Sequence, residues 1–370
     1  MSGRVFQVVE HLRDGDGVSL VARRFVPLLA PLGGEGPILV RRADAAVRGE
    51  TAPVDAVAWR ADDVAVVHVS GHSALEPLVS RLPARVALYF HNITPPEFFG
   101  PGGGLAEYTR RGWAQLPRLA RAADAWFAPS AYNLRALEAA SGTTRPSHVI
   151  PPPCDPAAER AAPLDALRLA ALRARGETNF LTVGRLAPNK RLERVMDAFD
   201  WYHGRIDRRS RLHLIGDATL DPDYVRRLLA HREALGARAA IEVTGKVSDE
   251  TLHAHFAGAH VYLTLSEHEG FCLPPVVALA HDVPVFARAA AALPETLGEG
   301  AVLLHADDPP RTAEVVHAIL ADEGLRRRLV AAGRRALVRF APATVAAAWA
   351  AALGALRATP RRAAAASRVG

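Results

Sequence analysis

The hydrophobic pattern of this 370-residue chain alternates short apolar runs with longer amphipathic ones from end to end. Many of the short runs are rich in β-branched residues and apolar at successive positions, as in strands buried on both faces of a parallel sheet. Strands are predicted in the first half at residues 4–9, 37–41, 64–69, 85–91, 125–128 and 148–150, and in the second at 179–183, 211–215, 240–244, 260–265, 284–287 and 301–304.

Helical periodicity fills the segments between these strands. In KRLERVMDAF, for example, Leu192, Val195, Met196 and Phe199 recur at spacings i, i+3, i+4 and i+7, which places them on one face of a helix. Strands that alternate with helices predict parallel sheets joined by right-handed crossovers. The fold class is therefore α/β, with doubly wound, Rossmann-like sheets.

The strand pattern restarts near the middle of the chain. Residues 151–153 are three consecutive prolines, and a helical stretch poor in strands follows them. Proline-rich punctuation marks a domain boundary or a hinge. The predicted organisation is a domain at 1–155, a linker at 156–176, a second domain at 177–340, a helix at 341–357 that packs back toward the first domain, and a basic, disordered tail at 358–370.

Composition narrows the class of protein. Apolar residues make up 49% and charged residues 23%, which is globular. The two cysteines, Cys154 and Cys272, are too far apart for a zinc ribbon and too few for a disulfide scaffold, so a cytoplasmic location is expected. The start of the chain does not resemble a signal peptide, and the apolar run 345–356 is shorter than the roughly 20 residues of a membrane span. The net charge of +6 favours anionic ligands or reflects arginine-rich composition.

A basic loop follows the strand predicted at 179–183. Gly184 lets the backbone turn there, and Arg185 and Lys190 flank the start of the next helix. A helix amino terminus offers free N–H groups and the positive end of a dipole, so two cations beside it form a diphosphate site. The alternative is an ordinary basic loop on a basic protein.

An acidic loop, SEHEGFCLPP, follows the strand predicted at 260–265. Glu269 stands where the strand ends, and Gly270 allows close backbone approach to a ligand. The backbone amides of Phe271, Cys272 and Leu273 then face phosphate or ribose oxygens. The alternative is a solvated acidic turn. His268 is interpreted as a bystander.

Two further candidates lie in the first half. His91 closes the strand predicted at 85–91 and would point into a cleft, or would be a structural histidine. Gly15 and Gly17 follow the first strand and could form a tight phosphate-binding loop. The DxD spacing at 14–16 recurs at 221–223, so it is weak evidence for a metal. Absence of GxGxxG after the first strand gives little support to a nicotinamide cofactor.

Together these loops resemble the retaining glycosyltransferases of family four, which have the GT-B fold of two Rossmann-like domains facing each other across a cleft. The resemblance rests on GRLAPNK at 184–190, GKV at 245–247, EGFCLP at 269–274, DVPVFA at 282–287 and LPETLGEGAVLL at 293–304. The first half matches less sharply, through the DGDG loop, HNITPPEFF at 91–99 and the run before the prolines.

The resemblance implies a metal-independent hexosyltransferase without a cofactor, whose substrates are a nucleotide-sugar donor and a glycan acceptor. Arg185 and Lys190 would stabilise the leaving nucleoside diphosphate. Glu269 would accept hydrogen bonds from hydroxyls of the donor sugar, and His91 would face the sugar from the first, acceptor-side domain. HNITPPEFF favours a GDP-linked mannose or deoxymannose donor.

The remaining predicted contacts are made mainly by backbone. The amides after Gly270 would line the phosphates and sugar, the turn around Val247 would contact the base, and Gly15 and Gly17 would lie near the diphosphate and acceptor. One position departs from the family pattern. The family places a second glutamate with seven residues between it and the first, to hold the ribose, and Val277 stands there. Either another group holds the ribose, or the grip is looser, or activity is lost.

Such enzymes extend glycans, often lipid-linked, in polysaccharide biosynthesis at the cytoplasmic membrane face. The basic and aromatic segment 108–127 would suit peripheral membrane contact, or would be a surface helix whose aromatic residues belong to the core. Two alternatives stay open: a catalytically silent subunit that binds sugar nucleotides, suggested by Val277, and a sugar-nucleotide epimerase of the same fold. A nucleic-acid partner is not expected, because no aromatic-basic RNA motif is present.

Overall fold

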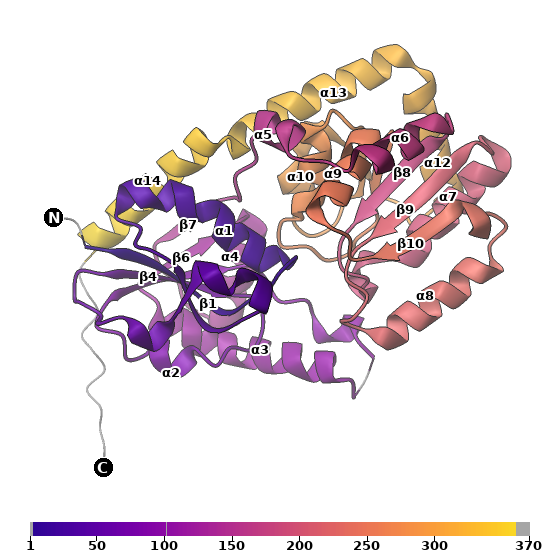
Figure 1. Ribbon diagram of the computed structural model, residues 1–370. Helices are drawn as coiled ribbons and strands as arrows, with labels where there is room; N and C mark the ends of the chain where they lie inside the picture. Colours follow the sequence, from indigo (N-terminus) through magenta and orange to yellow (C-terminus); the bar gives the residue numbers. More distant parts are fainter. Residues whose placement is uncertain (1–2, 101, 360–370) are drawn as a thin grey trace. The chain divides into compact units, whose positions relative to one another are not determined.

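The structure, a computed structural model, describes residues 3–100 and 102–359. Contacts between Cα atoms divide the chain into two compact units. Unit 1 covers Met1–Pro153 and Pro342–Gly370, and unit 2 covers Cys154–Ala341. Figure 1 shows both units, each built around a sheet with helices on its faces.

Unit 1 contains, within its described residues, a seven-stranded parallel sheet in the order β3-β2-β1-β4-β5-β6-β7. Its strands are β1 Val5–Leu12, β2 Ile38–Ala43, β3 Thr51–Pro53, β4 Val64–Val69, β5 Arg85–Phe90, β6 Ala125–Ala128 and β7 Ser147–Val149. Its helices are α1 Gly17–Leu29, α2 Glu76–Val79, α3 Gly104–Ala122, α4 Ala131–Ser141 and α14 Pro342–Ala358, with short 3-10 turns η1 Ala30–Leu32, η2 Ala45–Glu50, η3 Val54–Ala56 and η4 Pro96–Phe98.

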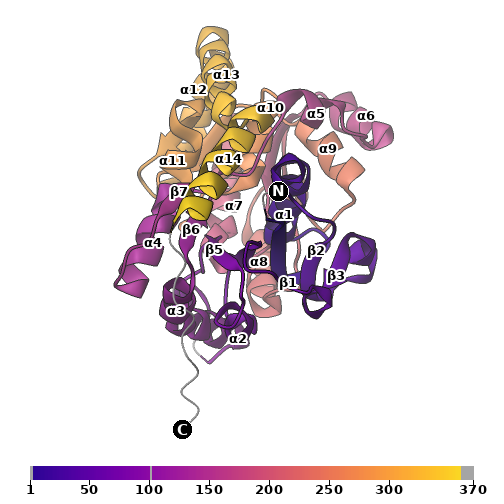
Figure 2. The same cartoon turned by 90° about the vertical axis from the view of Figure 1, so that its left-hand side faces the viewer.

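The alternation of side chains along each strand builds two cores in unit 1. Phe6 and Val8 of β1 pack in a cluster with α3 and α4, whereas Val5 packs with α1 and α14 on the other face. Trp349 of α14 is fully buried there against Phe25. Figure 2 shows α14, in yellow, beside β6 and β7. The carboxyl-terminal helix is thus an integral part of the hydrophobic core of unit 1.

Unit 2 contains, among the residues described, a six-stranded parallel sheet in the order β10-β9-β8-β11-β12-β13. Its strands are β8 Thr178–Val183, β9 Ser210–Ile215, β10 Ile241–Gly245, β11 Val261–Thr264, β12 Val285–Arg288 and β13 Ala301–Leu304. Its helices are α5 Pro156–Ala161, α6 Ala166–Ala174, α7 Leu192–Arg205, α8 Pro222–Ala234, α9 Asp249–Gly258, α10 Leu273–Ala280, α11 Leu293–Leu297, α12 Pro309–Ala321 and α13 Glu323–Leu337, with 3-10 turns η5 Pro188–Lys190, η6 Arg238–Ala240, η7 Gly298–Gly300 and η8 Val338–Phe340.

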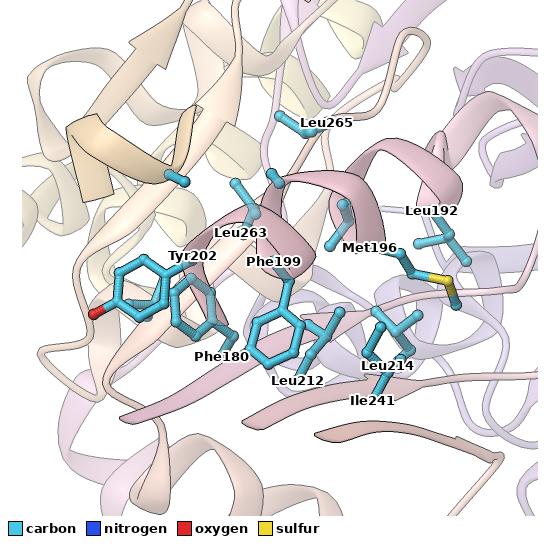
Figure 3. Packing of buried hydrophobic residues seen from close by; sticks show 14 of the residues in the cluster. Phe180, Leu192, Met196, Phe199, Tyr202, Leu212, Leu214, Ile241, Leu263 and Leu265 are labelled. Atoms are coloured by element: carbon cyan, nitrogen blue, oxygen red, sulfur yellow. The ribbon is translucent and has the colours of Figure 1, made fainter. Parts of the chain in front are cut away.

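The predicted apolar face of α7 is confirmed. Leu192, Val195, Met196 and Phe199 are all at most 2% exposed. They pack on Phe180 and neighbouring residues of the sheet, as Figure 3 shows. Two parallel, Rossmann-like sheets also confirm the predicted fold class.

Two segments differ from the sequence-based expectation. Residues 156–176, expected as a linker, form α5 and α6 and belong to unit 2. Leu172 of α6 is buried beside Gly258 of α9, where a Cβ on the glycine would lie 3.0 Å from the leucine. The other difference is β3, a short edge strand that the hydrophobic pattern did not predict. Of the expected disordered tail, residues 360–370 lie outside the described residues.

Among the described residues, one helical stretch, Glu323–Ala358, is long and apolar enough by length and composition alone to cross a membrane. The sequence run 345–356 is too short by itself, and the stretch becomes long enough only because α13 and η8 precede it. Core helices pass the same test, and the apolar side of α14 is buried in unit 1: Val345, Trp349, Ala352, Leu353 and Leu356. The stretch therefore carries no argument for a membrane span.

Candidate functional site

The loop after β8 positions Lys190 and Arg185. Gly184 has a φ of 151°, a conformation that favours glycine, and a Cβ there would lie 3.4 Å from Cε and Nζ of Lys190. Lys190 ends η5 and folds back over this glycine, while Arg191 begins α7 at a φ of 49°. Arg185 is exposed, and its charge acts on Lys190. The structure thus brings together both predicted cations beside Gly184.

Lys190 forms an ion pair with Glu269 from the loop after β11. The distance from Nζ to Oε1 is 2.5 Å, and the two side chains are 16% and 10% exposed. Burial lowers the pKa of Lys190, but the electrostatic interactions with Glu269 and Cys272 and the hydrogen bond to Glu269 together hold this pKa above its usual value. Burial likewise raises the pKa of Glu269, and Lys190 reverses the effect. Both groups are therefore charged near neutral pH.

The ion pair leaves donor capacity unused. An ammonium group has three N–H donors. Among the described residues, Lys190 gives one side-chain hydrogen bond, to Glu269. Two N–H donors on a nearly buried cation therefore remain for a ligand.

Around this pair, the two loops are fixed to each other by groups that the sequence did not single out. The side chain of Asn189 donates to the backbone oxygen of His268 (2.9 Å), and the backbone N–H of Glu267 donates to Asn189 O (2.9 Å). Glu267 pairs with Arg191 and Arg288 at 2.7 and 3.4 Å. These contacts hold Lys190 and Glu269 at a fixed spacing.

The loop after β9 lies next to Gly184. A Cβ at Gly216 would lie 1.9 Å from the carbonyl oxygen of Gly184, so the close approach of these loops requires a glycine. Burial raises the pKa of the adjacent Asp217, but hydrogen bonds from Thr219 and the charges of Arg185 and Lys246 hold it below its usual value. The signal available in the sequence was Gly-Asp directly after a predicted strand.

The predicted backbone contacts lie at the same edge of the sheet, because parallel strands present their carboxyl ends together. Gly245 ends β10 at a φ of 70°, and its carbonyl accepts from Gly216 N at 2.9 Å. Val247 is half-buried against the neighbouring apolar cluster. Three loops, after β8, β9 and β10, are therefore joined by backbone hydrogen bonds.

The segment 270–273 opens helix α10. Gly270 follows Glu269, and Cys272 begins the helix with a φ of 70°. The first N–H groups of an α-helix have no acceptor within the helix. Pro274 and Pro275 carry no N–H, so the amide of Leu273 is the one that the start of α10 itself offers before Val276. Phe271 packs edge-on against Phe340, 5.4 Å between ring centroids, so its backbone rather than its ring is available to a ligand. Burial raises the pKa of the Cys272 thiol, which is therefore neutral.

Val277, at the position of the family's second glutamate, lies in the apolar cluster under α10. Its side chain is 6% exposed, and Val276 beside it is fully buried. A carboxylate there would have to be accommodated among apolar atoms.

In unit 1, His91 follows β5 directly, and its backbone N–H donates to Val69 O at 2.8 Å. Its ring Nε2 lies 2.8 Å from Nδ1 of His68, a residue that the sequence analysis missed. Burial lowers the pKa of His91 from 6.5 to about 3, so the ring is neutral. The sequence signal for His68 was a single polar residue near the end of an apolar strand, VAVVHV.

Gly15 and Gly17 lie at the carboxyl end of β1. Gly15 has a φ of 71°, and Gly17 is the first residue of α1, where an added Cβ would have no atom within 4 Å. Between them, Asp16 caps the helix by accepting from Ser19 N at 3.1 Å. Asp221 of the other DxD sequence caps α8 in the same way. Both DxD spacings thus arise at helix starts, and no cluster of three or more metal-binding side chains occurs within residues 3–100 and 102–359.

Comparison with known proteins identifies the family. The family model of "Glycosyltransferase Family 4" matches residues 5–158, and that of "Glycosyl transferases group 1" matches residues 168–336. The chain belongs to the family-four glycosyltransferases. This is the retaining family with the GT-B fold that the sequence resembled, so that prediction is confirmed.

Curated relatives of this chain are also glycosyltransferases. The chain is 32% identical over 201 residues to D-inositol 3-phosphate glycosyltransferase of Xylanimonas cellulosilytica, a match that covers 52% of this chain and 47% of that protein. It is 35% identical over 138 residues to MMP alpha-(1->4)-mannosyltransferase of Mycolicibacterium hassiacum, covering 36% and 32%. The matched region spans less than half of the length of each of these curated relatives.

Among solved structures, HepE of Anabaena in complex with UDP-glucose superposes with a TM-score of 0.74 and 16% identity, over 94% of this chain and 99% of that one. At that identity the likeness shows the shared fold. In this chain, the loops that carry Arg185, Lys190 and Glu269 meet at the carboxyl edge of the unit 2 sheet.

Proposed function

We propose that the protein transfers a hexose from a nucleoside-diphosphate sugar to a hydroxyl of a glycan, with retention of the anomeric configuration. The observation that carries the proposal is the Lys190–Glu269 pair, a nearly buried cation with two unused donors beside the amino end of α10. Membership in family four and the printed activities of the two curated relatives support it. GDP-mannose is the first donor to test, because one relative is a mannosyltransferase.

The chemistry follows from where charge develops. The bond between the anomeric carbon and the diphosphate oxygen breaks, and negative charge builds on the leaving diphosphate. A fixed cation stabilises that charge more in the transition state than in the bound donor. Lys190 and Arg185 supply this cation pair. The acceptor hydroxyl forms the new bond to the anomeric carbon, and its proton leaves to the diphosphate or to solvent.

Glu269 and the loop amides complete the proposed donor site. The carboxylate of Glu269 accepts from sugar hydroxyls, and the amides of residues 271–273 bind the diphosphate. His91, Gly15 and Gly17 stay predictions for unit 1, on the sugar and acceptor side.

The acceptor class is a separate proposal, a lipid-linked glycan. The structure weakens one sequence argument for direct membrane contact. Trp126 is 2% exposed, Trp113 packs against Phe90, and Arg118 pairs with Glu76 at 2.5 Å. Trp113, Trp126 and Phe127 therefore belong to the core, whereas Tyr108 is 45% exposed. Cytoplasmic location and peripheral membrane contact stay predictions, which co-sedimentation with anionic vesicles would test.

Two measurements test the function. A thermal-shift panel of nucleoside diphosphates and sugar nucleotides finds the base, since a ligand stabilises by RT ln(1 + [L]/Kd). The best donor is then incubated with and without candidate acceptors, and NMR of the product's anomeric proton gives the stereochemistry. An α-linked product from an α-linked donor is expected. Binding without turnover would indicate a silent subunit, a new sugar nucleotide formed without acceptor an epimerase, and a β-linked product another mechanism.

A further inference from the structure

Three polar side chains from neighbouring strands form a hydrogen-bonded row that ends at His91. The side-chain N–H of Gln7 on β1 donates to Ala22 O in α1 at 2.9 Å. Gln7 Oε1 lies 3.1 Å from His68 Nε2 on β4, and His68 Nδ1 lies 2.8 Å from His91 Nε2 after β5. The strand order β1-β4-β5 places the three side chains side by side.

The fixed end of this row determines where every proton lies. The carbonyl of Ala22 can only accept, so the Gln7 amide nitrogen faces it and Gln7 Oε1 faces His68. His68 must therefore carry its proton on Nε2 and accept with Nδ1. His91 must then donate from Nε2. Because the ring is neutral, Nδ1 of His91 bears a lone pair, and no side-chain hydrogen bond to that atom is made within the described residues.

The surroundings keep the row neutral and rigid. His68 is 3% exposed and Gln7 6%. Burial lowers the pKa of His68 well below its usual value, with a smaller contribution from His91. The ring of Tyr89 lies 5.2 Å from that of His68 and 4.7 Å from that of His91. The hydroxyl of Tyr89 is itself fixed by a 2.6 Å hydrogen bond to Ile150 O.

We propose that His68, oriented by Gln7, is a positioning residue that holds His91 as a hydrogen-bond acceptor for a hydroxyl of the sugar substrate. This inference rests on the proposed function and adds a positioning residue to it. An acceptor nitrogen binds a group that carries a hydrogen. The hydroxyls of a sugar are such groups.

A double-mutant cycle tests whether His68 acts through His91. His68→Leu removes the acceptor for His91 Nε2–H, and we expect kcat/KM to fall about tenfold, the scale of one hydrogen bond. On the His91→Ala background the same substitution should have no further effect. His68→Asn keeps an acceptor oxygen near the place of Nδ1 and should restore much of the activity. The matched control is His213→Leu, at another buried histidine, in unit 2. This substitution should leave kcat/KM close to wild type.

A measurement without substrate separates this inference from the proposed function. NMR of ¹⁵N-histidine-labelled full-length protein near pH 7 should show Nδ1 of His91 unprotonated and Nε2 protonated. A protonated Nδ1, or an effect of His68→Leu that persists undiminished in the His91→Ala background, overturns the inference. The expected NMR pattern in a protein that turns over no sugar nucleotide would support the histidine row and overturn the proposed function.

Discussion

Two ion pairs of similar chemistry lie at opposite edges of the unit 2 sheet. At the carboxyl edge, Lys190 and Glu269 are 2.5 Å apart, and at the amino edge Arg168 and Glu242 are 2.7 Å apart. A cavity of about 260 Å³ opens beside the second pair, lined by Arg175, Arg211 and others. A cavity beside an ion pair would by itself mark the amino edge as a candidate ligand site.

The partners and the position of each pair lead to the opposite conclusion. At the amino edge several side chains share the pair: Arg168 also donates to His255 at 3.1 Å, and the two ring nitrogens of His213 face Glu242 and Asn179 at 3.0 and 3.1 Å. Hydrogen bonds from His213 and then Arg168 lower the pKa of Glu242 to about 2. At the carboxyl edge Lys190 keeps two unused donors. Ligands of parallel α/β sheets bind at the carboxyl ends of the strands, so we propose the donor site at Lys190 and expect the network around Arg168 to stabilise the fold.

The largest expected effect separates the two pairs directly. Lys190→Ala should lower turnover by about 10²-fold or more, the scale of losing one preorganised charge donor. Arg168→Ala should leave turnover close to wild type and lower Tm, because Glu242 and His255 lose their shared partner. Steady-state kinetics and thermal unfolding of both variants check this. Equal losses of turnover in the two variants would contradict the distinction.

Arg185→Ala tests the carboxyl edge again, without leaving a buried carboxylate unpaired as Lys190→Ala does. Arg185 is exposed, so its removal should leave Tm unchanged while turnover again falls by about 10²-fold. Binding of the free nucleoside diphosphate should weaken as well, which equilibrium titration measures. Kinetics like wild type would remove Arg185 from the proposed site.

A substitution at Val277 tests whether the ligand site extends along α10. Val277→Glu would bury a carboxylate in an apolar cluster, so we expect a clear fall in Tm and no gain in nucleotide affinity. Val276→Glu, at a fully buried neighbour, is the control and should destabilise at least as much. If instead Val277→Glu bound the nucleoside diphosphate about tenfold more tightly at nearly unchanged Tm, then Val277 faces the ribose and a lost acceptor has been restored.

A smaller effect concerns acid stability. The pKa of His91 falls from 6.5 to about 3 on folding. Between these pH values the unfolded chain binds a proton at His91 and the folded chain does not. The stability that this provides is full above pH 6.5 and is lost as pH falls toward 3, at about 1.4 kcal/mol per pH unit at most. His91→Gln should therefore flatten the loss of stability of unit 1 below pH 6.5. Denaturant unfolding followed by tryptophan fluorescence reports mainly on unit 1, which holds four of the five tryptophans.

Removal of divalent metal ions is expected to have no effect on activity. In the proposed donor site, Arg185 and Lys190 would take the place of a metal at the diphosphate, so activity should survive excess EDTA. Asp16, one of the candidate metal ligands, is already used as a helix cap. Loss of activity that magnesium or manganese restores would return Asp14 and Asp16 as metal ligands.

The fold was largely predictable because buried parallel strands have a strong hydrophobic signal. β4, β6 and β13 have the predicted bounds, and most other strands differ by a residue or two. β3 was missed because Thr51–Pro53 is a three-residue edge strand with no apolar run. Helix α6 was expected within a linker because its sequence is short and alanine-rich, and the contact of Leu172 with α9 is invisible in sequence.

The candidate site was predictable where loop sequence carries the chemistry, as for Lys190 and Glu269. It was not predictable where chemistry depends on which strands are neighbours. Gln7, His68 and His91 are far apart in sequence, and only the order β1-β4-β5 brings them into one row. A histidine in VAVVHV by itself is equally consistent with a satisfied core residue.

Binding of the nucleoside diphosphate to three proteins tests the central claim most directly. Calorimetric titration of wild type, Lys190→Ala and Arg168→Ala with the diphosphate chosen by the thermal-shift panel compares the two edges of one sheet. Binding at the carboxyl edge predicts that Lys190→Ala loses most of the affinity while Arg168→Ala binds like wild type. Normal affinity in Lys190→Ala together with lost affinity in Arg168→Ala would place the ligand in the cavity at the amino edge and contradict the account.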